Sequence, residues 1–348
     1  MNPAEIDVIA PNLKRRLSGV TATIVRLVPV QARMIGIAAT GPGLPADLPH
    51  IALWRLPWLP RDRWRVWHAR RNTEMVLGLV LRRVFRRKLR LMFTSAAQRH
   101  HRSFTRWLIR QQEALVTTSP AAAGYLERPA RVVMHGVDTA VFTPEPDRAG
   151  LRRAIGWPED AVLLGCFGRI RAQKGVDLLI EAALRLLPAR PNVQIILTGR
   201  ITPDNHAFHA DLAARLAAAG LAERVRFLGE LPWSDLVRHY QTLDLFIAPA
   251  RWEGFGLTPL EAMACGVPVV ATRVGAFESL IVEGVTGSLV APGDADALTE
   301  AIRGWIDAPD RIMRAREAAR AHVLNAHAIA TEAEALVAIY RSLLERAQ

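Results

Sequence analysis

Residues 251–261, RWEGFGLTPLE, set two carboxylates around a glycine-rich turn that leads into a predicted helix. The segment follows an apolar run at 245–248, which is typical of a buried strand. Gly254 and Gly256 lack a Cβ and let a ligand approach the backbone closely, and Thr258 is expected to cap the helix. A strand, a turn and a helix start in this order predict an anion site at the carboxyl end of a parallel strand.

The two carboxylates of this segment suit sugars better than phosphates, because a carboxylate accepts hydrogen bonds from hydroxyl groups. Glu261, about one turn inside the helix, is expected to bind a ribose. Glu253, on the preceding loop, is expected to face a second sugar. The alternative is that both acids are favoured only by the dipole at the helix N-terminus.

The C-terminal half alternates short apolar runs with amphipathic stretches. The predicted strands are 162–167, 193–198, 225–228, 245–248, 267–271 and 288–290. The predicted helices are 176–187, 207–219, 234–241, 259–265 and 295–306. This alternation predicts a parallel, doubly wound α/β sheet. The N-terminal half predicts a second α/β domain, with a helix at about 20–27 and strands at 6–10, 34–38, 89–94, 114–117 and 131–134.

The octapeptide at 168–175, GRIRAQKG, follows the first of these C-terminal strands and opens a helix. Its terminal glycines, with Arg169 and Lys174 between them, predict a site for a diphosphate. The segment lacks the GxxxxGK[ST] pattern of P-loops that bind ATP. By itself the string is a weak signal, because Lys and Gly commonly begin surface helices.

Composition indicates a reducing environment. Cys166 and Cys265 lie in apolar or helical stretches without metal-ligand spacing. The N-terminal residues contain no apolar core of signal-peptide length, and no run approaches the roughly 20 apolar residues that span a bilayer. We therefore expect a cytoplasmic protein, peripheral on the inner face of the cytoplasmic membrane.

The formal charge of +12 is concentrated in one segment, residues 61–110. This segment holds fourteen arginines and one lysine against Asp62 and Glu74, beside an apolar run at 75–81. Basic residues beside an amphipathic stretch predict binding to an anionic membrane surface. The alternative is a packed domain helix with a solvated arginine edge. Nucleic acid is not expected as a partner, because no zinc-finger spacing or aromatic RNA-binding motif accompanies the charge.

The pairing of GRIRAQKG with EGFGLTPLEAMACGVPVVAT resembles the donor domain of the family 4 retaining glycosyltransferases, over residues 162–297. The resemblance implies the GT-B fold, in which two Rossmann-like doubly wound α/β domains face a cleft. It implies catalytic roles for Arg169 and Lys174 on the donor diphosphate and for Glu253 against the sugar. It also implies ribose binding by Glu261. The other implied donor-binding residues of this domain are Gly254, Phe255, Gly256 and Leu257.

The resemblance also divides the chain. Residues 1–142 are expected to form an acceptor-binding domain, and residues 143–327 a domain that binds the nucleotide sugar. Residues 328–348 are expected to form a helix that packs back on the first domain. His135 stands where the family usually has Asn, and we interpret it as structural.

The N-terminal domain offers fewer matches. Gly19 stands in the family's glycine-rich first loop and is expected to contact the donor. Many relatives place a histidine after the fourth or fifth strand, so His100 and His101 are candidate catalytic residues, with a surface or phosphate-binding pair as the alternative. PNLKRRLSGVTATI together with HARRNTEM is similar to the lipopolysaccharide-core mannosyltransferases. This similarity implies GDP-mannose as donor and a lipopolysaccharide-core or other membrane-associated glycan as acceptor.

The expected reaction uses the nucleotide sugar as substrate and needs no metal or other cofactor. Asp294 and Asp296 form a D-x-D string, but their place after a Pro-Gly turn favours a helix cap. The resemblance implies transfer with retention of anomeric configuration. Three alternatives stay open: a UDP-sugar-dependent glycosyltransferase, a sugar-nucleotide epimerase or hydrolase, and a basic membrane or nucleic-acid adaptor.

Overall fold

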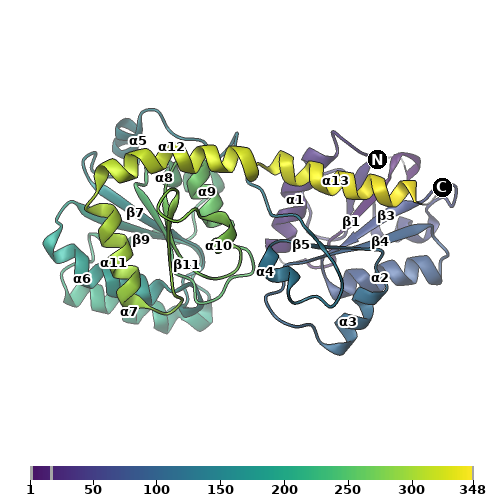
Figure 1. Ribbon diagram of the computed structural model, residues 1–348, viewed down its shortest axis with the longest axis horizontal. Coiled ribbons are helices and arrows are strands. Elements are labelled where there is room, and N and C mark those ends of the chain that lie inside the picture. The colour runs from purple at the N-terminus through teal and green to yellow at the C-terminus, as the bar shows by residue number, and fades with distance from the viewer. Residues whose placement is uncertain (1–2, 16–18, 347–348) are drawn as a thin grey trace. The chain divides into compact units, whose positions relative to one another are not determined.

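The computed structural model describes residues 3–15 and 19–346 and divides into two compact units (Figure 1). The N-terminal unit comprises Met1–His135 and Ile329–Gln348, and the C-terminal unit comprises Gly136–Ala328. Both units contain a six-stranded parallel sheet with helices around it. The prediction of two doubly wound α/β units is therefore confirmed.

The chain enters the C-terminal unit after His135, earlier than the boundary at residue 142 that we predicted. The reason is that the residues after the crossing are bonded to the C-terminal unit. The Val137 amide donates to the His327 carbonyl at 2.9 Å, and Arg320 donates to the Phe142 carbonyl at 2.7 Å. The Phe142 ring is buried within 5.7 Å of the Tyr240 ring.

The N-terminal sheet has the strand order β2-β1-β3-β4-β5-β6. Its strands are β1 (Val8–Pro11), β2 (Ile37–Thr40), β3 (Arg65–Ala69), β4 (Leu89–Ser95), β5 (Ala114–Thr117) and β6 (Arg131–Val132). The helices of this unit are α1 (Gly19–Gln31), α2 (Asn72–Arg83), α3 (Ser103–Arg110), α4 (Pro120–Ala123) and α13 (Ile329–Glu345). A 3₁₀ segment, η2 (Leu53–Trp58), precedes β3.

Strand β3 is absent from our sequence prediction, although it pairs with both β1 and β4. Its sequence, RVWHA, mixes basic and aromatic residues and lies inside the arginine-rich segment. In the structure every residue of β3 is buried, and Arg65 donates to the Pro60 carbonyl at 2.8 Å. Because Arg65 is buried and hydrogen-bonded to the backbone, β3 lacks the apolar pattern by which a buried strand is recognised in a sequence.

Each face of the N-terminal sheet has its own core. On one face α1 and α13 pack together, with Leu27 and Tyr340 fully buried. On the other face α2 packs against the sheet through Leu79 and the buried Trp67 ring. A Cβ on Gly78 of α2 would come within 2.6 Å of Trp67, so the helix and sheet are in close contact there. The apolar side of α2 therefore lies in the core, as the domain-helix alternative expected.

The C-terminal sheet has the order β12-β11-β10-β7-β8-β9. Its strands are β7 (Val162–Phe167), β8 (Val193–Thr198), β9 (Val225–Phe227), β10 (Leu245–Ala248), β11 (Val269–Thr272) and β12 (Gly287–Val290). Its helices are α5 (Arg148–Ala154), α6 (Val176–Leu186), α7 (His206–Ala218), α8 (Trp233–Thr242), α9 (Thr258–Ala264), α10 (Phe277–Leu280), α11 (Ala295–Ile306) and α12 (Pro309–Ala326). Strands β7 and β10 are hydrogen-bonded neighbours, so their carboxyl ends lie side by side.

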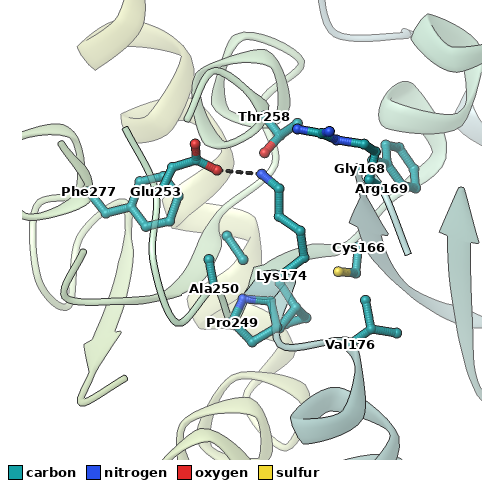
Figure 2. Close-up of a pocket in the computed structure, with 13 residues that line it drawn as sticks. Cys166, Gly168, Arg169, Lys174, Val176, Pro249, Ala250, Glu253, Thr258 and Phe277 are labelled. Carbon is teal, nitrogen blue, oxygen red and sulfur yellow. Dashed lines mark hydrogen bonds and ion pairs between the residues drawn. The ribbon is translucent and has the colours of Figure 1, made fainter. Parts of the chain in front are cut away.

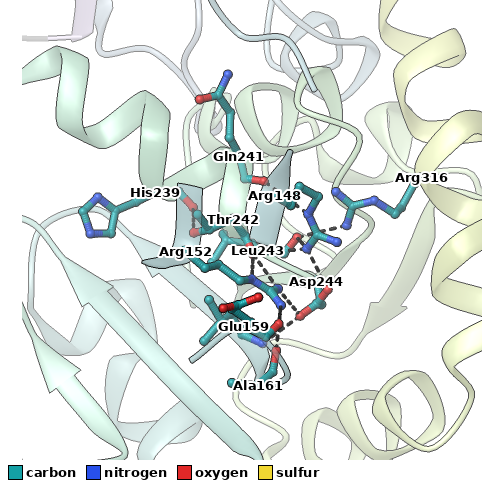
Figure 3. Close-up of polar contacts among 11 residues, drawn as sticks. Arg148, Arg152, Glu159, Ala161, His239, Gln241, Thr242, Leu243, Asp244 and Arg316 are labelled. Atoms are coloured by element: carbon teal, nitrogen blue, oxygen red, sulfur yellow. Dashed lines mark hydrogen bonds and ion pairs between the residues drawn. The ribbon is translucent and has the colours of Figure 1, made fainter. Parts of the chain in front are cut away.

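A largely buried ion-pair network, drawn in Figure 3, fastens α5 and α8 to the start of β10. Asp244 accepts from Arg148 and Arg152, each at 2.7 Å, and from the Leu163 amide at 2.8 Å. The same arginines donate to the Thr242 carbonyl at the end of α8, where helix carbonyls lack intrahelical partners. Burial raises the pKa of Asp244, but the two arginine charges outweigh burial and hold it below its usual value.

Within the described residues, the helices are all too short or too polar to cross a bilayer.

Candidate functional site

A pocket opens at the carboxyl ends of β7 and β10 in the C-terminal unit (Figure 2). Its polar side chains include Arg169 and Lys174 from the segment after β7 and Glu253 from the segment after β10. These are the three predicted catalytic residues, and the structure brings them to one pocket. Apolar lining comes from Phe167, Val176, Ile247, Pro249, Ala250 and Phe277.

The loop after β7 can reach this pocket because of one glycine conformation. Gly175 has φ of +69°, a left-handed value that favours glycine. A Cβ there would also overlap the carbonyl oxygen of Pro249. Gly175 therefore lets Lys174 and the N-terminus of α6 approach the end of β10.

Polar contacts fix the two loops against each other. Arg251 makes a two-bond pair with Asp177, each bond 2.7 Å long, and its amide donates to the Gln173 carbonyl at 2.9 Å. Gln173 in turn donates from Nε2 to the Trp252 carbonyl at 3.1 Å. Because these bonds join segments from two strand ends, they hold the facing side chains in place before a ligand arrives.

The centre of the pocket is an ion pair between Lys174 Nζ and Glu253 Oε2, which point toward one another in Figure 2. The other oxygen, Glu253 Oε1, accepts from the Gly254 amide at 3.0 Å. Arg171 lies close by. Burial, and then the positive charge of Arg169, lower the pKa of Arg171, and the negative charge of Glu253 partly offsets this. The site therefore holds more positive than negative charge, as a diphosphate requires.

Cys166 also lines the pocket, but it is a poor nucleophile. Burial raises the pKa of its thiol to about 12, and the charge of Lys174 offsets this only partly. At neutral pH the residue is therefore a thiol, which is far less reactive than a thiolate.

Glu261, the predicted ribose-binding residue, lies in the first turn of α9. It is 7% exposed and does not line the pocket around Lys174. Its Oε2 accepts from the hydroxyl of Tyr240 at 2.8 Å. Burial, and then the Glu261 charge, raise the pKa of Tyr240, so this hydroxyl stays protonated and donates.

The glycine-rich segment before Glu261 turns tightly around the pocket. Gly256 has φ of +85°, and a Cβ there would collide with the Phe277 ring. Phe255 is buried, whereas Gly254 and Leu257 are partly exposed. Helix α9 begins at Thr258 with Leu257 at the N-cap, so the prediction that Thr258 caps the helix is wrong by one position. The proline that follows has no amide hydrogen, which a helix start does not need.

Our predicted site lacked two residues that contribute to the pocket or contact a predicted site residue. Phe277 lines the pocket, and Tyr240 bonds Glu261. Phe277 lies within residues 162–297, the range that resembles the family, so the resemblance carried a signal for it. Tyr240 lies in the last turn of α8, where a buried tyrosine is an ordinary core residue, so the sequence held no signal for it.

The N-terminal candidates lie in the other unit. Gly19 is the first residue of α1 and is exposed, while the preceding Ser18 lies outside the described residues. His101 Nε2 is 3.2 Å from Ser95 Oγ at the end of β4, and His100 packs edge-on against Tyr125. His135 Nδ1 lies 2.7 Å from Glu332 Oε1 on α13.

Among the described residues, no group of three or more His, Cys, Asp or Glu side chains is placed to hold a metal ion. Asp294 accepts from the Ala297 amide at 2.8 Å and caps α11, which confirms its predicted role. Asp296 pairs with Arg185 on α6. The D-x-D string is thus engaged in helix capping and an ion pair.

Comparison with known proteins agrees with this geometry. Residues 147–322 match the family described as glycosyl transferases group 1. The fold is similar to the crystal structure of Anabaena Alr3699/HepE in complex with UDP, with a TM-score of 0.85. That match covers 97% of this chain and 100% of the other at 20% sequence identity, so it supports the fold alone.

Two relatives match almost the whole chain. The lipopolysaccharide core biosynthesis mannosyltransferase LpcC of Rhizobium leguminosarum bv. viciae is 49% identical, over 98% of this chain and 97% of the relative. The lipopolysaccharide core biosynthesis mannosyltransferase LpsB of Rhizobium meliloti (strain 1021) is 46% identical, over 98% of both chains. The chain therefore belongs to the group 1 glycosyl transferases, as a member of the GT-B fold class.

Proposed function

We propose that this glycosyltransferase moves mannose from GDP-mannose to a lipopolysaccharide-core or other membrane-associated glycan, with retention of anomeric configuration. The observation that carries the proposal is the convergence of Arg169, Lys174 and Glu253 on one pocket at the ends of β7 and β10. The full-length similarity to two mannosyltransferases supports the sugar and the acceptor class.

The leaving group of this reaction is a nucleoside diphosphate, which gains negative charge as the sugar–phosphate bond breaks. Arg169 and Lys174 are positioned to meet that charge, and the N-terminus of α6 after Gly175 adds backbone amides. Preorganised donors of this kind need no rearrangement during the reaction. In this proposal cationic side chains, and no metal ion, stabilise the leaving group.

Glu253 has a different part in the proposal. Its contacts with Lys174 and the Gly254 amide hold the carboxylate beside the cations that take the diphosphate. There it can accept hydrogen bonds from hydroxyl groups of the transferred sugar. The acceptor hydroxyl attacks from the face that the diphosphate leaves, and its proton passes to the departing phosphate. Gly19 is proposed to approach the donor from the N-terminal unit.

We propose that Glu261, near the start of α9, binds the ribose of the donor. The Tyr240 hydroxyl donates to one oxygen of this carboxylate, and a carboxylate accepts hydrogen bonds from hydroxyl groups such as those of a ribose.

The proposal includes peripheral binding to the inner face of the cytoplasmic membrane through exposed parts of residues 61–110. The apolar side of α2 is buried, so α3 supplies the apolar contact: Phe104 and Trp107 are exposed and stacked, with ring centroids 6.1 Å apart. Exposed basic residues nearby in sequence, outside the arginines that pair with Glu127, are Arg99 and Arg102. Aromatic rings beside arginines suit an interface of anionic headgroups.

The donor is tested by thermal unfolding of the full chain with GDP, GDP-mannose, UDP and UDP-glucose. Ligands that bind the folded state raise the melting temperature. We expect GDP and GDP-mannose to raise it and the uridine nucleotides to leave it unchanged. A shift with UDP-glucose and none with GDP-mannose would overturn the donor assignment.

Transfer is then measured with GDP-mannose and core oligosaccharide, and the anomeric configuration of the product is read by NMR. We expect α-linked product from the α-linked donor. Rapid, complete hydrolysis of the donor without acceptor would instead favour a sugar-nucleotide hydrolase.

A further inference from the structure

A second pocket lies in the N-terminal unit, along one side of α3 and remote in sequence from the residues around Lys174. It is walled by the segment after β4, by α3 and by the segment that follows α4. Its polar lining residues are His100, His101, Arg106, Arg110, Glu127 and Arg128. The proposed reaction on the donor uses none of them.

The charge of this pocket is unbalanced. Glu127 Oε1 accepts from Arg106 at 2.7 Å, and its Oε2 accepts from Arg110 at 3.3 Å. Hydrogen bonds from these arginines, the one from Arg106 being the stronger influence, lower the pKa of Glu127, so it is ionised at neutral pH. One carboxylate faces two guanidinium groups, each with five N–H donors, and most of those donors remain available to a ligand.

Arg128 adds to the positive charge while serving the fold. Its Nη1 donates to the carbonyls of Ile109 and Gln112, each at 3.0 Å, and so caps the C-terminal end of α3. Because this arginine is fixed by the backbone, its charge stays at the pocket wall whether or not a ligand is present.

At the histidine end of the pocket, His101 supplies a neutral hydrogen-bonding group. Burial, and then the charges of Arg99 and His100, lower the pKa of His101, so its imidazole is neutral at pH 7. It lies 3.2 Å from Ser95 Oγ, which ends β4. This end of the pocket therefore lies at the carboxyl edge of the sheet, where doubly wound folds bind their ligands.

We infer that this pocket binds an oxyanion, a carboxylate or phosphate, carried by the acceptor glycan. The inference rests on the proposed function and on the expectation, from the family resemblance, that the N-terminal unit binds the acceptor. A glycan whose reacting sugar lies at the edge of the sheet would extend along α3 from His101 toward Arg106. The i, i+4 spacing of Arg106 and Arg110 puts both guanidinium groups on one face, which suits a planar or tetrahedral oxyanion.

The same chemistry could be supplied by a membrane lipid headgroup. The aromatic pair Phe104 and Trp107 lies at i, i+3 on a different part of the α3 surface from Arg106, which borders the pocket. The Arg106 side of α3 is thus separate from the aromatic pair, whereas Arg110 stands at i, i+3 from Trp107 and borders both surfaces. A soluble acceptor without its lipid distinguishes the two sources directly.

The test is the double variant R106Q/R110Q, assayed with delipidated core oligosaccharide. Charge-assisted hydrogen bonds at a partly exposed site predict a rise of roughly ten- to hundred-fold in the KM for the acceptor, with kcat little changed. The same double variant should bind carboxyl-reduced, dephosphorylated acceptor as well as the wild type does. Equal KM values of variant and wild type for the anionic acceptor would overturn the inference.

E127Q is the matched control, because it breaks the same ion pairs from the other side. If the pairs only hold the loop in place, E127Q and R106Q/R110Q should impair transfer alike, and that result contradicts a binding role. If the arginines bind the acceptor, removal of the competing carboxylate should lower the acceptor KM or leave it unchanged.

Two further measurements distinguish acceptor binding in this pocket from donor binding and from membrane binding. The thermal shift with GDP-mannose should be the same in all three proteins; its absence in the wild type would count against the proposed function and not against the pocket. Sedimentation with vesicles of phosphatidylglycerol should be weakened less by R106Q/R110Q than by replacement of Phe104 and Trp107 with serine. Loss of vesicle binding with an unchanged acceptor KM would assign the pocket to a lipid headgroup and overturn the glycan inference.

Discussion

Lys174→Ala is expected to slow mannose transfer by about two orders of magnitude. The side chains of Lys174 and Glu253 are 22% and 17% exposed, so their pair lies in a largely water-excluded pocket where charges interact strongly. Removing one preorganised contact to a developing charge costs about 3 kcal/mol of activation free energy, which is about 10² in kcat/KM. Lys174→Arg keeps the charge and should retain more activity.

The contact between Lys174 and Glu253 also predicts how their variants combine. Because Nζ and Oε2 are paired, the effects of Lys174→Ala and Glu253→Gln should not add. We expect a coupling of roughly 1–3 kcal/mol, so that the second substitution costs less once the first is present. The assay is transfer from radiolabelled GDP-mannose under kcat/KM conditions for wild type, both single variants and the double variant.

Circular dichroism and melting without ligand establish that each of these proteins is folded. Transfer by folded Lys174→Ala within threefold of wild type would refute the leaving-group role. Strict additivity of the two substitutions would refute a shared task in the transition state, even if each single variant were slow.

Three other predictions concern stability, the loop after β7 and the membrane. Asp244→Asn should lower the free energy of unfolding by about 3–5 kcal/mol, because it leaves Arg148 and Arg152 without their carboxylate; urea denaturation at pH 7 measures this. The pKa of Asp244 is lowered in the folded state, so ionised Asp244 stabilises the fold at pH values above its ordinary pKa. This stabilisation is lost as the pH falls through the lowered pKa. The free energies of unfolding of wild type and Asp244→Asn should therefore converge in acid. Gly175→Ala should abolish the rise in melting temperature with GDP-mannose, because the new Cβ would overlap the Pro249 carbonyl. Gly284→Ala is the control, since Gly284 has φ of +75° but lies in open space. It should lower the free energy of unfolding by about 1 kcal/mol and leave the donor-induced rise intact. Replacing Phe104 and Trp107 by serine should weaken sedimentation with anionic vesicles, and binding of the wild type should fall steeply with salt; wild-type binding insensitive to salt would contradict the role of the basic segment.

Much of the C-terminal unit could be predicted because its strands are continuous apolar runs. Val193–Thr198 and Leu245–Ala248 were predicted with the bounds that the structure shows. The N-terminal unit was harder, since β3 is a buried strand built from basic and aromatic residues. Arg65 donates to the backbone carbonyls of Pro60 and Pro3, and hydrophobic periodicity does not reveal such bonds.

The arginine-rich segment shows a similar division. The sequence located the charge between residues 61 and 110, but it could not say which arginines are exposed. Arg65 and Arg87 bond backbone carbonyls, and Arg82 pairs with Glu113. Burial of a guanidinium depends on which carbonyls and carboxylates the fold brings near it, and local composition does not contain that information.

The sequence by itself determined the alternating α/β pattern, the two polar loops and the residue types that suit a sugar nucleotide, because these depend on near neighbours in the chain. Only the tertiary structure decided that Lys174 meets Glu253, which is 79 positions away, and that Glu261 is bonded to Tyr240 outside the pocket around Lys174. The first contact exists because β7 and β10 are adjacent strands with their carboxyl ends together, and the second because α8 and α9 pack against each other. Strand order and helix packing are set by the burial of the whole core, so they appear only when the chain is folded.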